Sequence, residues 1–366
     1  MHSDLLLVIV IVVALGFDFT NGFHDTANVV ASAISTRALA PRTAIALASL
    51  LNFAGAFLSL KVAATIATGI IDPAQVTETI AFAGLLGAIT WNLITWSQGL
   101  PSSSSHALIG GVIGAMLAAV GGAGVKGAAV ITKVVIPAIV APIAAFSAAG
   151  VAIIVIYLVL GRRRPGPVAR GFRIGQFFST SLLSLAHGTN DAQKTMGVIT
   201  LALVAHGSLS ASHASVPTWV VVASATAISL GTYAGGWRII RTVGSRIIKM
   251  DAAQGLAAQG AGAIVILVSS HFGYPLSSTH VISGGVIGAG AAKRVSAVRW
   301  GVAGNIAAAW VVTLPAAALF GAIAYGLATV FGSGALGPLL LTVVAFGVIT
   351  TTVAARRRGM AEAASV

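Results

Sequence analysis

The sequence predicts an all-α polytopic membrane protein with about 10–12 transmembrane helices in two inverted-topology repeats. One observation is composition: hydrophobic residues make up 57% of the 366 residues and charged residues 8%, with a mean hydropathy of +0.97. A second is repetition, because two polar motifs each occur twice in an otherwise apolar chain. The third is the placement of basic clusters at the ends of apolar runs, which indicates how the chain alternates across a membrane.

The net charge of +13 comes from basic residues whose positions agree with the predicted topology. Seventeen of the 21 Lys and Arg residues fall in five short clusters, each at the end of an apolar run. This distribution predicts cytoplasmic loops and no nucleic-acid partner. The absence of cysteine excludes disulfides and thiolate metal sites. The clusters are Arg37 with Arg42, 162–173, 238–249, 293–299 and 356–358.

Residues 1–160 form the first predicted repeat, with the N-terminus outside. Apolar runs separated by basic or polar boundaries divide it into five membrane segments. The fourth begins with serines and is rich in glycine, so it could be re-entrant rather than spanning. The predicted segments are residues 5–36, 43–71, 79–99, 102–122 and 134–160.

A basic linker, residues 161–171, is predicted to lie in the cytoplasm between the repeats. Because five segments precede it, the second repeat (172–355) starts from the opposite side and is inverted relative to the first. The tail, 356–366, is expected in the cytoplasm, and the second serine segment could also be re-entrant. The predicted segments are residues 172–205, 217–237, 254–272, 276–292, 301–331 and 338–355.

The first repeated motif places acidic groups inside predicted membrane segments. Residues 22–28 read Gly-Phe-His-Asp-Thr-Ala-Asn, and residues 188–194 read Gly-Thr-Asn-Asp-Ala-Gln-Lys. A carboxylate near the bilayer centre costs about 2.5–3.5 kcal/mol on insertion scales. Asp18, Asp25 and Asp191 are therefore candidate functional residues, although Asp18 has no acidic counterpart in the second repeat.

Glycines and amides surround these acids. Gly22 and Gly188 are expected to let the helix unwind and expose backbone groups to a bound ion. An amide can offer its oxygen to a cation or its N–H groups to an anion. The amides at these positions are Asn21, Asn28, Asn190 and Gln193.

The second repeated motif joins a hydroxyl tract to a glycine-rich segment. PSSSSHALIGGVIGA begins at Pro101 and PLSSTHVISGGVIGA at Pro275, and ten of the fifteen aligned positions are identical. Proline and serine suit a helix start, where hydroxyls and free backbone N–H groups can converge on an anion. The alternative is that the serines only cap the helix and mediate packing. Two matched tracts favour anion binding by Ser103, Ser104, Ser105, Ser277, Ser278 and Thr279.

Four histidines, His24, His106, His187 and His280, lie in the same motifs. Their expected role is to orient or cap the motifs, with a proton relay as the alternative. No pair of these histidines has the spacing of metal ligands on a helix, so the sequence predicts no metal site and no cofactor.

These four motifs together resemble the inorganic phosphate transporter (Pit/PiT) family, in particular its bacterial low-affinity permease branch. The family signature Gly-Ala-Asn-Asp-Val-Ala-Asn appears in modified form at residues 22–28 and 188–194. The resemblance implies phosphate held between broken helices at the inner membrane. It places one wall of the site at Asp18, Asn21, Asp25 and Ser103, Ser104 and Ser105, and the other at Asn190, Asp191, Ser277, Ser278 and Thr279.

The resemblance also bears on the coupling ion. Bacterial members of the family are similar in using protons and in accepting phosphate complexed with a divalent metal, whereas another branch uses sodium. Here Lys194 stands where the first repeat has Asn28, and its ammonium could replace a sodium ion permanently. We therefore expect proton-coupled symport with Asp18, Asp25 or Asp191 as the carrier, and a sodium-coupled phosphate symporter is an alternative.

Phosphate is favoured over sulfate because HPO₄²⁻ can donate its hydroxyl proton to a carboxylate, whereas SO₄²⁻ cannot. A sulfate permease of the same family remains an alternative. The chain is not expected to be an enzyme, since an intramembrane serine hydrolase needs one asymmetric catalytic set and these elements occur in both halves. Expected partners are inorganic phosphate and membrane lipid, and the sequence leaves a homodimer open.

Overall fold

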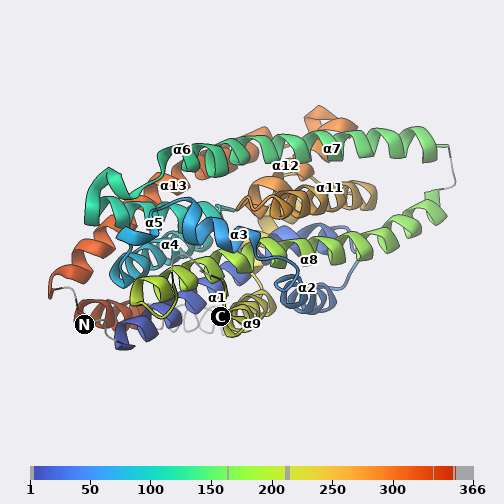
Figure 1. The fold of residues 1–366 in the computed structure, drawn as a ribbon. Helices are drawn as coiled ribbons and strands as arrows, with labels where there is room; N and C mark the ends of the chain where they lie inside the picture. Colours follow the sequence, from blue (N-terminus) through green and yellow to red (C-terminus); the bar gives the residue numbers. More distant parts are fainter. Residues whose placement is uncertain (1–3, 163–164, 211–214, 333, 349–350, 352–366) are drawn as a thin grey trace, which may run out of the picture.

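The computed structural model describes residues 4–162, 165–210, 215–332, 334–348 and 351. These residues are almost entirely helical and contain no strand. The predicted cluster at 356–358 and the tail 356–366 lie outside the described residues. Figure 1 shows the helices as one elongated bundle in which α1 and α8 run along the long axis.

The first half of the chain begins with the long helix α1 (Asp4–Ser35). The helix α2, the short helix α3 and a π-helical turn come next. The helices α4 and α5 then form a hairpin, and the long helix α7 ends the half. The bounds are α2 Pro41–Gly55, α3 Lys61–Ala64 followed by a π-helical turn Thr65–Gly69, α4 Glu78–Gln98, α5 Ser104–Val120, α6 Gly127–Val130 and α7 Ile136–Leu160.

The second half repeats this order of elements. Its long first helix is α8 (Pro165–His206), and its hairpin is formed by α11 and α12. The remaining bounds are α9 Thr218–Ala234, α10 Trp237–Arg241 followed by a π-helical turn Thr242–Arg246, α11 Ala252–His271, α12 Ser278–Lys293, α13 Trp300–Thr329 and a short apolar helix Leu336–Val348.

The predicted fold class is confirmed. Six helices among the described residues are long and apolar enough to cross a membrane, and a seventh results if the bent α9–α10 pair is one span. The other predicted segments are too short or too polar to cross alone. For example, α12 has 16 residues, which at about 1.5 Å per residue falls short of a hydrocarbon core of about 30 Å.

One predicted membrane segment is wrong. The segment 43–71 is not one helix, because α2 ends at Gly55 and the chain turns before α3 begins at Lys61. The predicted linker 161–171 overlaps the next helix, because α8 begins at Pro165. Proline is well accommodated in the first turn of a helix, where its missing N–H has no helical partner to lose.

The two halves pack against each other reciprocally. The hairpin α4–α5 packs on α13 of the second half, and α11–α12 packs on α7 of the first. Glycines permit this: an added Cβ at Gly114 would lie 1.8 Å from the Ala318 carbonyl oxygen, and one at Gly288 would lie 2.1 Å from that of Phe146. Small residues at these contacts let the helix backbones touch.

The expected unwinding at Gly22 and Gly188 is wrong, since α1 and α8 are continuous through both positions. An added Cβ at Gly22 would lie 2.3 Å from the Ile228 carbonyl oxygen, and one at Gly188 would lie 2.1 Å from that of Asn52. These glycines therefore let α1 approach α9 and α8 approach α2. Their function is close packing, which a helical backbone satisfies without a break.

The helical backbone is interrupted instead in the two hairpin loops, between α4 and α5 and between α11 and α12. The first hairpin turns through Gly99 (φ 68°) and the second through Gly273 (φ 76°), a left-handed conformation that favours glycine. The two loops meet: Ser105 Oγ donates to the Leu276 carbonyl at 2.8 Å. In Figure 1 the two hairpins lie toward opposite ends of the long axis. The helix starts of both serine segments therefore meet inside the bundle.

Candidate functional site

The polar motifs converge in the middle of the bundle, where α1 and α8 pass the starts of α5 and α12. The side chains gathered there are buried, each exposing 5% of its surface or less, so this polarity is shielded from lipid. We call them the polar cage. Its members are Asp18, Asn21, His24, Asp25, Asn28, Ser102, Ser103, Ser104, Ser105, His106, His187, Asn190, Asp191, Lys194, Ser277, Ser278, Thr279 and His280.

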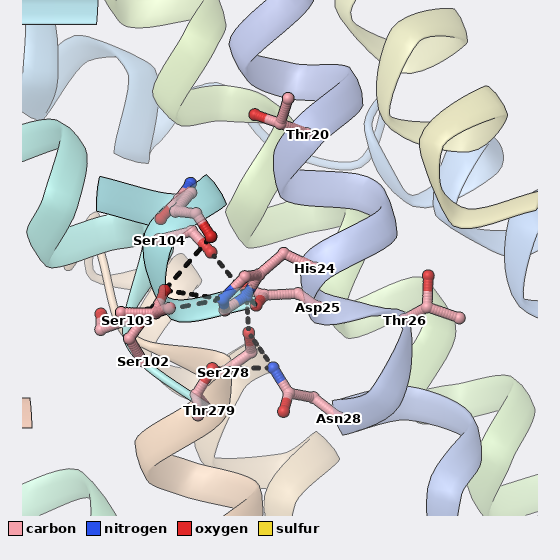
Figure 2. Close-up of polar contacts among 12 residues, drawn as sticks. Thr20, His24, Asp25, Thr26, Asn28, Ser102, Ser103, Ser104, Ser278 and Thr279 are labelled. Atoms are coloured by element: carbon pink, nitrogen blue, oxygen red, sulfur yellow. Dashed lines mark hydrogen bonds and ion pairs between the residues drawn. The ribbon is translucent and has the colours of Figure 1, made fainter. Parts of the chain in front are cut away.

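Asp25 and Asn28 join α1 to the start of α12. One oxygen of Asp25 lies 2.7 Å from His24 Nδ1, and the other accepts from the Ser278 hydroxyl at 3.2 Å. Asn28 Nδ2 donates to Thr279 Oγ1 at 2.9 Å and to Ser278 Oγ at 3.3 Å. Figure 2 shows these side chains converging from the two helices. The first acidic motif therefore holds the hydroxyl tract of the second repeat.

Asp191 has polar partners on both of its oxygens. Lys194 Nζ contacts one oxygen, and His187 Nε2 lies 3.0 Å from the other. The Ser278 hydroxyl lies 3.3 Å from that second oxygen, and the same hydroxyl also contacts Asp25. The two motif acids thus approach one shared hydroxyl from different helices.

The Lys194 ammonium is buried between the two hairpin loops. In addition to Asp191, it contacts Ser105 Oγ at 2.5 Å and the Leu276 carbonyl oxygen at 2.8 Å. An ammonium in such a place is stable only when a countercharge and hydrogen-bond acceptors replace its hydration. One carboxylate, one hydroxyl and one carbonyl fill its three donor positions here.

Two of the predicted hydroxyl ligands, Ser103 and Ser277, cap helices. Ser103 accepts a hydrogen bond from the His106 N–H at 3.1 Å, and Ser277 accepts one from the His280 N–H at 3.3 Å. These two serines therefore cap α5 and α12, as the alternative interpretation of the tracts expected. Their caps fix the helix starts at which the remaining hydroxyls are presented.

Ser102 and Ser104 lie beside His24. Ser102 Oγ is 3.4 Å from His24 Nε2, and Ser104 Oγ is 3.5 Å from His24 Nδ1, which are long contacts for hydrogen bonds. Ser102 is fixed more firmly by Thr95 Oγ1 at 2.7 Å. The Ser104 hydroxyl is therefore weakly held and can turn toward a ligand.

Asp18 and Asn21 precede Asp25 on α1 and are buried, and Thr195 on α8 is the polar neighbour of the Asp18 carboxyl. Both oxygens of Asp18 and both amide atoms of Asn21 lack a hydrogen bond within the described part of the chain. Burying such groups unpaired is costly, so an ion, a proton or water belongs there. Asp191 and Lys194 act on Asp18 electrostatically, which joins it to the second motif.

Two of the predicted amides support the hairpins and neighbouring helices. Asn190 donates to Ser270 Oγ at 2.8 Å and to the Tyr274 carbonyl at 3.2 Å, which ties α8 to the second hairpin. Gln193 Oε1 accepts from the backbone N–H of Val62 at 2.9 Å, at the start of α3. Only the Asn190 oxygen is left without a partner among the described atoms of these two side chains.

A cation could be held where the two motifs meet. Asp25, His187 and Asp191 offer ligand atoms that all lie within 4.8 Å of one another. The four motif histidines are not spaced as a pair of metal ligands on one helix, and this cluster instead joins one histidine to two carboxylates. His187 and Asp191 are four residues apart on α8, so they share one face, and Asp25 is added only by the fold.

Comparison with known proteins decides the family. The model of the phosphate transporter family matches residues 21–169 and 162–321, which include both acidic motifs and both hydroxyl tracts. The chain belongs to the phosphate transporter family. The prediction made from the four motifs is therefore confirmed.

Relatives of this phosphate transporter family member carry consistent names. Proteins named "probable low-affinity inorganic phosphate transporter" are 54% identical in Mycobacterium bovis, over 89% of this chain and 78% of theirs, and 50% identical in Rhizobium meliloti, over 87% and 96%. A solved structure titled "The sodium-dependent phosphate transporter" matches with a TM-score of 0.81 and 25% identity, over 88% of this chain and 98% of that one. The relatives are transporters and not enzymes, and the chain is a multi-pass membrane protein.

Some residues of the cage region could not have been found from the motifs. Thr95 comes from α4, outside both motif pairs, and its 2.7 Å contact with Ser102 exists only because the hairpin folds back. Asn92, one turn earlier on α4, is buried with both amide atoms unpartnered in the described structure. A buried asparagine in an apolar segment is a weak signal in sequence, because many such residues only mediate packing.

Proposed function

We propose that this protein is a secondary active transporter of inorganic phosphate that couples uptake to protons by alternating access. Family membership supports phosphate transport, and the enclosed polar cage suits a carrier that occludes its ligand. The observation that carries the choice of coupling ion is the buried ammonium of Lys194. It lies among Asp191, Ser105 and the Leu276 carbonyl, which are oxygen ligands of the kind a sodium ion would need.

The pseudo-equivalent position supports this interpretation. Asn28 aligns with Lys194, and Thr279, which Asn28 contacts, aligns with Ser105, which Lys194 contacts. The two repeats thus present the same contact with an amide in one case and an ammonium in the other. A tethered cation neutralises the site but cannot travel with the substrate. A mobile ion would therefore act elsewhere, and Asp18 is a buried carboxylate that can take and release a proton.

Phosphate would lie near Ser104, Ser278 and Thr279, within reach of Asp25. A carboxylate there accepts the hydroxyl proton of HPO₄²⁻ and repels SO₄²⁻, which favours phosphate over sulfate. If the substrate carries a divalent metal, the cluster of Asp25, His187 and Asp191 offers ligands for it. Labelled phosphate uptake should be inhibited by arsenate and little affected by sulfate; strong inhibition by sulfate would favour the sulfate alternative.

The orientation follows from the charge distribution. From the basic loops we infer that the C-terminus and the 161–171 linker lie in the cytoplasm of an inner-membrane protein and that the second repeat is inverted. The reciprocal packing of the hairpins on α13 and α7 supports inverted repeats. Rocking of one part against the other would then expose the cage to each side in turn.

The decisive experiment is uptake into proteoliposomes with separately imposed pH and sodium gradients. We expect phosphate accumulation with an inward proton gradient in sodium-free buffer, and no stimulation by a sodium gradient at fixed pH. Strict dependence on sodium at fixed pH would show that the coupling ion is wrong, while leaving phosphate transport intact. Saturable flux that follows a gradient would also distinguish a carrier from a channel.

A further inference from the structure

A second polar pocket, with a volume of about 510 Å³, lies beside the loop of the first hairpin, outside the polar cage. One wall is the end of α4, and the other is α10 with its π-helical turn. We call it the arginine pocket. It is lined by Ser97, Gln98, Gly99, Trp237, Arg241, Thr242 and Arg246.

The fold holds this pocket against the hairpin loop. The chain bends by 68° between α9 and the segment Ile239–Arg246, which brings that segment under the loop. An added Cβ at Gly236 would lie 2.1 Å from the Phe23 carbonyl oxygen, so the bend is packed directly on α1. The Thr242 hydroxyl then donates to the Gly99 carbonyl at 3.0 Å. The pocket is therefore a built part of the loop's surroundings.

The pocket is positively charged. Arg241 and Arg246 are both exposed, and neither makes an ion pair with any acidic residue that the structure describes. Arg299, outside the pocket lining, donates from its Nη1 to the Arg246 carbonyl at 3.5 Å. Guanidinium groups bind phosphate oxygens through paired, charge-assisted hydrogen bonds, and the hydroxyl and amide groups of Ser97 and Gln98 add further polarity.

The first repeat contains a matched structure without these arginines. Its π-helical turn Thr65–Gly69 lies under the second hairpin, where an added Cβ on Gly273 would be 3.2 Å from Thr65 Oγ1. Matching this turn to Thr242–Arg246 aligns Ala64 with Arg241 and Gly69 with Arg246. The turn therefore does not need arginine in order to form.

The lysines near the Thr65–Gly69 turn come from other segments. Lys126 donates to the Thr68 carbonyl at 2.8 Å, and Lys133 Nζ lies near Gly69. The pair of guanidiniums on the turn itself is a property of the second repeat. Because this guanidinium pair occurs at one end of the bundle, it points to a role on one side of the membrane.

Polar contacts connect the loop beside the arginine pocket to the polar cage. Gly99 belongs to the loop that leads into Ser102, and Ser102 Oγ lies 2.7 Å from Thr95 Oγ1. Ser102 also lies 3.4 Å from His24, the neighbour of Asp25. An anion released on this side of the first hairpin would meet the two arginines next.

We propose that the arginine pocket binds a phosphate group at the cytoplasmic mouth of the transporter. Its occupant is free phosphate leaving the cage, a role that rests on the proposed function. The same chemistry would also accept the phosphodiester headgroup of an anionic lipid, and the experiment separates the two.

The test uses the absence of native cysteine, which makes single-cysteine variants of the full chain simple to label. Gln98→Cys places a thiol in the pocket, and Phe272→Cys places one at the position preceding Gly273 in the other hairpin. In phosphatidylcholine nanodiscs, inorganic phosphate should slow maleimide labelling of Gln98→Cys several-fold and leave Phe272→Cys unchanged. Adding Arg241→Gln and Arg246→Gln to the Gln98→Cys chain should abolish this protection.

Two further measurements, one with the Asp191→Asn variant and one in nanodiscs that contain phosphatidylglycerol, distinguish the possible outcomes. Protection that persists when Asp191→Asn disables the cage supports local binding, whereas protection lost with Asp191→Asn reports a conformational change and overturns the proposal. Protection that requires phosphatidylglycerol assigns the pocket to a lipid headgroup. No protection in either lipid, or protection that survives loss of both arginines, overturns the site. Protection of the Gln98→Cys chain, together with no proton-driven uptake by the wild-type chain, would refute the proposed function and leave the pocket standing.

Discussion

At the scale of single residues, the charge balance of the cage depends on Lys194. Its ammonium lies between an acid and two neutral oxygens, and the acid beside it shares the Ser278 hydroxyl with Asp25. A change at any of these positions alters the charge that the ligand meets. Removing one partner of a buried ion pair commonly costs about 3–5 kcal/mol, because the other charge stays buried.

Lys194→Asn should change the coupling ion. The amide restores the residue type of the first repeat and leaves Asp191, Ser105 and the Leu276 carbonyl free to hold a sodium ion. We expect proton-driven uptake to fall and sodium to stimulate what remains, measured in proteoliposomes. Lys61→Asn, at an exposed lysine, is the control and should behave as wild type. Unchanged proton coupling in Lys194→Asn would contradict the proposed role.

Asp25→Asn and Asp191→Asn should each abolish coupled phosphate uptake without loss of membrane insertion. Each substitution keeps the size of the side chain but removes the charge that contacts the shared hydroxyl and can accept the phosphate proton. Uptake and membrane-fraction abundance are measured together. Asp72→Asn, outside the cage, is the matched control. Normal uptake by both cage variants would remove the central claim.

At the scale of elements, the hairpins are positioned by close backbone contacts. Gly110 and Gly114 lie against α13, and Gly284 and Gly288 lie against α7. The serine caps then fix where each hairpin's second helix begins. The same glycines that resemble a membrane packing motif in sequence thus determine how deeply the hydroxyl tracts enter the bundle.

Gly114→Val should therefore destabilise the protein. The first added carbon would lie 1.8 Å from the Ala318 carbonyl oxygen, so the hairpin must shift. Overpacking of this kind costs about 1–3 kcal/mol and should lower the Tm of the purified protein. Gly326→Ala in α13, where nothing lies within 4 Å of the added carbon, should leave the Tm equal or slightly higher. Equal Tm values for Gly114→Val and wild type would show that the contact is relaxed.

At the scale of the whole molecule, charge determines orientation and packing determines the site. The ends of the bundle differ: α8 ends at His206 on one side, and the basic turn after α10 lies at the other by the predicted topology. In the alternating access that we propose, the cage opens to each side in turn while its own residues stay in place.

The topology can be tested with two exposed serines. Ser208 follows the end of α8, and Ser245 lies in the π-helical turn beside the arginine pocket. In spheroplasts, a membrane-impermeant thiol reagent should label Ser208→Cys directly and Ser245→Cys only after permeabilisation. Labelling of both from the outside would contradict the assignment of the basic loops to the cytoplasm.

Composition, repetition and charge clusters in the sequence were enough to predict an α-helical membrane transporter, and the resemblance of its four motifs predicted the family. The motifs also contained most of the side chains that the fold gathers in the cage. Each of these signals is contained in a short stretch of sequence: the length of an apolar run, a duplicated motif or a basic cluster at the end of a run. The tertiary structure alone decided that α1 and α8 run unbroken, that the breaks lie in the hairpin loops, and that Lys194 lies between Ser105 and Leu276. Helix continuity at Gly22 depends on how closely α9 approaches, and a buried ion pair depends on residues that only folding brings together.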